Sequence, residues 1–118
     1  MILVDTSVWV EHFRGGKTGL ETLLNDGLVS CHPLIVGELA CGNLANRSEI
    51  FVLLHTLPTA ISAEHEEVMQ FIEKYRLMVK GLGYIDMHLL ASAMLTNIPL
   101  WTLDERLHKV SSTMKISY

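Results

Sequence analysis

The sequence predicts an α/β sandwich with a mainly parallel sheet. Short apolar runs alternate with longer helix-forming stretches along the chain, which is the pattern of strands connected by helices. The first run, residues 1–4, is continuously apolar, as expected for a strand that is covered on both faces. Because strand–helix–strand units in one sheet take right-handed crossovers, helices should cover the sheet.

Five short strands are expected. Each is a brief apolar run bounded by turn or helix signals, and Pro99 lies near the start of the fourth run, where proline is tolerated. The predicted strands are residues 1–4, 28–32, 57–61, 98–102 and 114–118. Since no repeat or linker interrupts them, residues 1–118 are expected to form one domain.

Helices are expected between these strands. Pro33 fits the first turn of one helix, and Ser62 can cap another, whose apolar positions repeat at helical spacing. The predicted helices are residues 8–13, 20–24, 33–42, 47–56, 63–75, 84–96 and 103–110.

Composition limits the class of protein. Of the 118 residues, 49% are hydrophobic, which is enough for a core, and the net charge of −4 argues against non-specific coating of nucleic acid. The lysines and arginines are dispersed, as on a solvated surface. The two cysteines form no C-x-x-C pair, which excludes a typical zinc or redox motif, and Cys41 is expected in the core. No apolar run could span a bilayer, so a soluble, cytoplasmic protein with no membrane contact is expected.

Two acidic residues lie on apolar faces of predicted helices. Leucine or isoleucine occupies the positions three and four residues before Glu38, and leucine those three and four residues after Asp86. A buried carboxylate without a partner is unfavourable, so each needs one. An arginine or a backbone amide could serve that purpose, and so could a metal ion.

Two further acids follow predicted strands. Asp5 ends the first strand and Asp104 comes two residues after the fourth. Each could cap the helix that follows it. If the two strands are neighbours, both acids emerge at one edge of the sheet, where they can meet Glu38 and Asp86. Because four nearby carboxylates repel one another, this arrangement favours a bound Mg²⁺ or Mn²⁺.

Other functions are less well supported. A metal-free ribonuclease would use paired histidines, but the six histidines show no compact pairing. A phosphoacceptor receiver domain would need an aspartate at the end of residues 57–61, which contain none. A non-catalytic interaction module is disfavoured, because all four acids are intact. Separately, Trp9, Phe13 and Phe51 with Leu53 and Leu54 could form a groove for a partner helix, although core packing explains most of them better.

Four segments together resemble the motifs of PIN-domain ribonucleases. Residues 1–10 resemble the opening of these proteins, and residues 35–39, 81–93 and 100–104 resemble their second, third and fourth acidic motifs. Order and spacing fit along essentially the whole chain. Within the family, the sequence is most similar to VapC toxins of type II toxin–antitoxin modules.

The resemblance implies a three-layer α/β/α sandwich and Mg²⁺- or Mn²⁺-dependent cleavage of RNA. The implied partners are a VapB-type antitoxin, an RNA substrate (tRNA, rRNA or mRNA) and a second copy in a homodimer. Asp5, Glu38, Asp86 and Asp104 match the family's acidic positions, and Thr6 and Thr102 match hydroxyl positions beside them. Many relatives carry a further acid after the fourth motif; Glu105 is the nearest counterpart here, which leaves one or two metals open.

A mechanism follows as a hypothesis. Asp5, Asp86 and Asp104 are expected to hold Mg²⁺, which lowers the pKa of a bound water and neutralises the scissile phosphate. Glu38 is expected to act as a ligand, to orient water or to serve as general base. The hydroxyl of Thr6 or Ser7 is expected either to contact metal-bound water or to cap the helix.

Overall fold

The computed structural model describes residues 1–118. Helices separate successive strands, as the sequence predicts, and four of them in succession lie between the second and third strands. The strands are β1 (Ile2–Val4), β2 (Val29–Ser30) and β3 (Leu100–Trp101); the helices are α1 (Thr6–Phe13), α2 (Leu20–Asn25), α3 (Pro33–Ala40), α4 (Arg47–Thr56), α5 (His65–Tyr75), α6 (Tyr84–Thr96) and α7 (Glu105–Thr113).

The sheet is parallel and has the strand order β2-β1-β3. Strand β1 is therefore central, and its three residues are buried, which explains its continuous apolarity. Its two neighbours lie at opposite edges, so the chain changes direction across the sheet at β1. The adjacent carboxyl ends of β1 and β3 form the kind of switch point at which α/β proteins bind ligands.

The predicted five-stranded sheet is wrong in its number of strands. The third and fifth predicted strands each contribute one isolated parallel bridge, Cys31 with Thr59 and Leu100 with Ser117. Pro58 has no N–H to extend the first bridge, and the left-handed backbone of Lys115 (φ 60°) interrupts the extended conformation before the second. Both segments run beside the sheet without forming a ladder.

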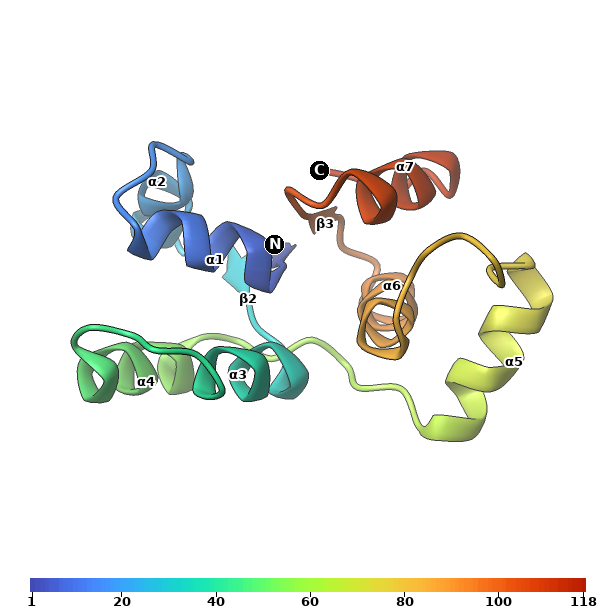
Figure 1. The fold of residues 1–118 in the computed structure, drawn as a ribbon, viewed down its shortest axis with the longest axis horizontal. Coiled ribbons are helices and arrows are strands. Elements are labelled where there is room, and N and C mark those ends of the chain that lie inside the picture. Colours follow the sequence, from blue (N-terminus) through green and yellow to red (C-terminus); the bar gives the residue numbers. More distant parts are fainter.

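Helices cover both faces of the sheet (Figure 1). Helices α1 to α4 lie to the left of the strands and α5 to α7 to the right, so the sheet is the middle of three layers. Helix α1 contacts α3 within one layer, and α5 packs against α6 within the other. Right-handed crossovers explain this division, because the chain moves toward β2 through the first set of helices and toward β3 through the second.

Three helices begin at positions other than those expected. Helix α7 begins at Glu105, after its cap Asp104, rather than at residue 103. Helix α1 begins at Thr6, directly after Asp5, rather than at residue 8. Helix α5 begins at His65 rather than near Ser62, and the Glu64 backbone N–H donates to the Glu67 side chain (2.9 Å). A glutamate three residues into the helix thus satisfies an N–H that would otherwise lack a partner.

The core lies between the sheet and its flanking helices. Trp9, Leu3 and Leu89 are among its fully buried side chains. Cys31 is buried, but Cys41 is exposed, so the expectation of a core position for Cys41 is wrong. It follows α3 directly, at the C-terminal end of that helix. None of the helices combines the length and the apolarity that crossing a membrane requires.

Candidate metal centre

Asp5 lies at the junction between β1 and α1 and is 7% exposed. Although it occupies the N-cap position, its side chain makes no capping hydrogen bond. Instead, its Oδ2 accepts hydrogen bonds from the hydroxyls of Ser7 and Thr102, each 2.7 Å long. Both bonds reach the same oxygen, so Oδ1 remains available to another ligand.

Ser7 and Thr102 are each held by a second contact. The Ser7 hydroxyl accepts the Leu103 backbone N–H (2.9 Å), and the Thr102 hydroxyl accepts the Asp104 backbone N–H (3.0 Å). Because each hydroxyl gives its single proton to Asp5, it is free to accept from the backbone. These bonds fix the loop after β3 against the start of α1 and orient the Asp5 carboxylate.

Asp86 lies in the first turn of α6 and is half-buried. Its Oδ2 accepts the Gly83 backbone N–H (3.0 Å). Burial raises the pKa of this carboxyl, the Gly83 hydrogen bond partly opposes the rise, and the negative charges of Asp5 and Asp104 raise the pKa further. Asp86 therefore lies within range of the charges of both Asp5 and Asp104.

Asp104 is exposed and caps α7. Its Oδ1 accepts the Leu107 backbone N–H (2.9 Å), so the capping role weighed from the sequence is present. The other carboxylate oxygen takes no part in that cap. Asp104 can therefore cap the helix and contribute to the acidic site.

Glu38 lies on α3 and is half-buried. Its Oε1 accepts the hydroxyl of Thr6 at 2.7 Å. Thr6, the residue directly after Asp5, thus donates to Glu38 and does not cap α1. The fold accordingly brings Asp86 within range of Asp5 and Asp104, and it connects Glu38 to the start of α1 beside Asp5 through Thr6.

The donor set suits a hard divalent cation, but the side chains do not form a closed ligand cage. No three acidic, histidine or cysteine side chains are arranged to hold one ion. Mg²⁺ commonly takes only one or two protein carboxylates and keeps several waters, so a closed cage is not required. Free carboxylate oxygens and mutual repulsion at Asp86 fit such an ion.

One buried polar pair near the sheet was not singled out from the sequence. His32 Nδ1 accepts the Leu34 N–H and caps α3, while His32 Nε2 lies 3.0 Å from the Ser92 hydroxyl. Burial, followed by the charge of nearby His88, lowers the pKa of His32 to about 4. The position of His32 directly before Pro33 is a capping signal that the sequence contains. A buried, neutral histidine gives no support to metal-free catalysis.

The fold and the acidic site define a class of protein, and comparison with known proteins identifies it. A family model described as "PIN domain" matches residues 2–112. The chain therefore belongs to the PIN-domain family, which confirms the resemblance and the expected class of enzyme, a nuclease of the hydrolase type.

Two curated relatives point to a narrower class within this family. The chain is 44% identical over 108 residues to proteins named Ribonuclease VapC32 from Mycobacterium tuberculosis strains CDC 1551 / Oshkosh and ATCC 25618 / H37Rv. Each alignment covers 91% of this chain and 87% of the relative. The chain is thus similar to a VapC-type member of the family, as its motifs indicate.

Solved structures show the same fold. PAE2754 from Pyrobaculum aerophilum superposes with a TM-score of 0.67 at 16% identity, over 99% of this chain and 87% of that one. FitAcB from Neisseria gonorrhoeae gives a TM-score of 0.62 at 17% identity, over 95% of this chain and 94% of that one. At such low identity these likenesses extend to the fold alone.

Proposed function

We propose that this protein is a Mg²⁺- or Mn²⁺-dependent endoribonuclease and the toxin of a VapBC-type toxin–antitoxin module. The observation that carries the proposal is the buried Asp5, oriented by two hydroxyls beside Asp86 and Asp104. Relatives named ribonucleases at 44% identity support RNA as the substrate.

The four acidic residues have two different roles in this proposal: three hold the ion and one accepts a proton. Asp5 through Oδ1, Asp86 and Asp104 would hold the ion. When bound, a divalent cation neutralises the scissile phosphate and acidifies water. Thr6 fixes Oε1 of Glu38 and leaves Oε2 to accept a proton from the attacking water, which makes Glu38 the general base in this proposal. The water oxygen bonds to phosphorus as the phosphorus–oxygen bond to the leaving nucleotide breaks.

The proposed antitoxin surface lies on α4 and the end of α1. Phe13, Ile50 and Leu53 line a shallow cavity of about 320 Å³ there, and Val52 on the same helix is 67% exposed. Trp9 and Leu54, for which the sequence allowed either this groove or core packing, are buried in the core and are unavailable to a partner. An apolar antitoxin helix fits this surface, and a basic side chain extending from it would compete with the metal. We also propose a homodimer, by likeness to the family.

The catalytic proposal is tested by incubating antitoxin-free protein with RNA. Cleavage is expected with Mg²⁺ and is expected to stop with EDTA. Asp5→Asn keeps the shape of the side chain and removes its charge, so cleavage should fall by more than about 100-fold, the upper range for groups that only support a metal ligand. Asp26→Asn, the same change at an exposed aspartate after α2, is the control and should cleave normally. Cleavage that survives EDTA or Asp5→Asn would contradict the proposal.

A further inference from the structure

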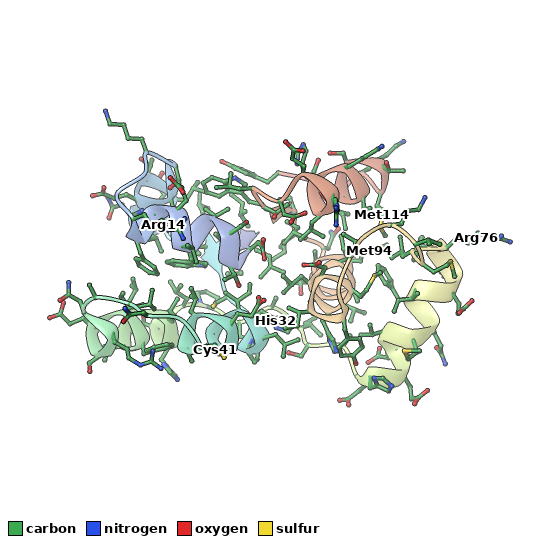
Figure 2. All side chains as sticks on the ribbon, in the orientation of Figure 1. Arg14, His32, Cys41, Arg76, Met94 and Met114 are labelled. Carbon is green, nitrogen blue, oxygen red and sulfur yellow. The ribbon has the colours of Figure 1, made fainter.

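A groove of about 720 Å³ lies between the end of α5, the segment of residues 76–83 and α7. Figure 2 labels Arg76, Met94 and Met114 on this side of the molecule, and all three line the groove. The segment that forms its rim passes between α5 and α7 before it enters α6 (Figure 1).

The groove is basic although the protein is acidic. Arg76, Lys80, Arg106 and Lys109 line it, and no acidic side chain does. These four are nearly half of the nine lysines and arginines in a chain whose net charge is −4. In the sequence they belong to two separate groups and resemble a solvated surface, but the fold places both groups in one groove.

The basic groove continues from the acidic site. The Arg106 side chain packs against Gly81, where an added Cβ would lie 2.8 Å from Arg106 Cδ, and Gly81 has a left-handed backbone (φ 77°). Gly81 precedes Asp86 by five residues, and Arg106 follows Asp104 by two. Since Asp86 and Asp104 lie within range of each other's charge, Arg106 marks the place where the acidic site ends and the groove begins.

The groove also offers apolar and aromatic surface. Tyr75 lines it, is 38% exposed and is braced by Phe71, whose ring centroid lies 5.0 Å away. Met94 lines it as well, and Val79 at its rim is fully exposed. Cations that follow a backbone, beside an aromatic ring on which a base can stack, are the features by which proteins hold single-stranded nucleic acid.

We propose that this groove binds the RNA strand on one side of the bond that is cleaved. The inference rests on the proposed ribonuclease function and adds to it the path of the substrate. Arg76, Lys80 and Lys109 hold successive phosphates, Arg106 holds the phosphate next to the acidic site, and Tyr75 stacks with a base. An RNA strand fits better than a second copy of this chain, because a copy carries a net charge of only −4 and this groove requires concentrated negative charge.

The test compares two charge-reversed pairs in the Asp5→Asn background, which should leave RNA intact. Lys80→Glu with Lys109→Glu alters the groove. Arg14→Glu with Lys17→Glu makes the same change in net charge at an exposed site on the other side of the molecule, near the Arg14 label in Figure 2. Arg106 is left unchanged because it packs beside the acidic site. Binding of a mixed-sequence single-stranded RNA is measured by fluorescence anisotropy between 50 and about 300 mM salt.

The groove pair should weaken binding about 25-fold at 0.1 M salt, since each lost phosphate contact removes about 0.7 from the salt slope. The slope itself should fall by about 1.4, while the control pair binds within about twofold of the parent. Equal affinity of the two pairs would overturn the proposal. So would a groove pair that alters the sedimentation coefficient and leaves RNA affinity unchanged, which would assign the groove to a second copy.

Two further measurements keep the result unambiguous. If the groove pair unfolds, as judged by circular dichroism, Lys80→Gln with Lys109→Gln replaces it, with half the change in charge and the same expected direction. The same pairs in the otherwise unchanged protein report cleavage, where the groove pair should raise KM for RNA. A parent protein that cleaves no RNA refutes the ribonuclease proposal, whereas cleavage with equal KM for both pairs refutes only the groove.

Discussion

At the scale of single residues, Thr102 shows how the site depends on a side chain that carries no charge. Its hydroxyl is buried, donates to Asp5 and accepts the Asp104 N–H. One atom therefore orients one proposed ligand and positions the backbone of another. In metal sites such supporting contacts set the affinity for the ion as well as its placement.

Thr102→Val tests this role, because valine has nearly the same shape and lacks the hydroxyl. Cleavage and Mg²⁺ affinity should each fall by about 10- to 100-fold. Stability should fall by about 1–3 kcal/mol, because the Asp104 N–H loses its acceptor. Isothermal titration with Mg²⁺ and urea unfolding measure the two effects, with Thr56→Val on the exposed end of α4 as control. Unchanged Mg²⁺ affinity would show that Thr102 does not support the site.

His32 predicts a dependence of stability on pH. Folding lowers the pKa of His32 from 6.5 to about 4. Between these two pH values, His32 is therefore protonated in the unfolded chain and neutral in the folded protein. Stability is therefore lost as the pH falls from 6.5 toward 4, by about 2 kcal/mol between pH 7.5 and pH 5. Burial lowers the pKa of His88 as well, which acts in the same direction.

Urea unfolding at several pH values measures the effect. His32→Asn keeps a side chain that can cap α3 and removes the titrating group, so its stability should vary less between pH 7.5 and pH 5. His108→Gln, at an exposed position on α7, should retain the slope of the parent protein. A parent slope that His32→Asn leaves unchanged would assign the pH dependence to other groups.

At the scale of elements, α7 combines a structural role with the proposed catalytic one. It begins at the residue after Asp104, which caps it, and its buried Leu107 anchors it to the core. Capping and metal binding need different properties of the Asp104 side chain. A short side chain with any oxygen acceptor can cap a helix, but only a carboxylate adds negative charge to the acidic site.

Asp104→Ser separates these demands. Serine retains the cap, so stability should stay within about 0.5 kcal/mol of the parent, whereas Asp104→Ala should lose about 1 kcal/mol. Both changes remove the carboxylate, so cleavage should fall equally and by more than about tenfold. Thermal unfolding and RNA cleavage give the two readouts. Full activity in Asp104→Ser would reduce Asp104 to a helix cap.

At the scale of the whole molecule, the acidic site holds negative charges close together. Burial is the main cause of the raised pKa of Asp86, and Asp5 and Asp104 add a smaller electrostatic repulsion. A cation that binds only the folded protein relieves it and stabilises the fold. At ten times its dissociation constant, Mg²⁺ should add about 1.4 kcal/mol, which corresponds to about 5 °C in Tm for a chain of this length.

Thermal unfolding with and without Mg²⁺ tests this, with NaCl of equal ionic strength as control. Asp5→Asn should lose most of the shift, since it removes the charge of the best-oriented carboxylate. Equal shifts in the parent and in Asp5→Asn would place the stabilising ion elsewhere on the protein.

The sequence by itself determined the fold class and the acidic residues. Continuous apolarity at residues 1–4 required a strand buried on both faces, and the inward placement of Glu38 and Asp86 required partners, because burial of an unpaired charge is unfavourable. Both conclusions depend on local patterns. Family membership, carried by four spaced motifs, follows from the sequence in the same way.

Only the tertiary structure decided how these parts meet. It reduced two expected strands to single bridges, because pairing depends on the backbone of both segments. It showed that Asp104 caps a helix while Asp5 does not, since a cap depends on where the neighbouring hydroxyls lie. It also joined Arg76 and Lys80 to Arg106 and Lys109 in one groove. Charged residues far apart in sequence form one surface only when the fold brings their elements together. The spatial distance between such elements cannot be read from a local sequence pattern.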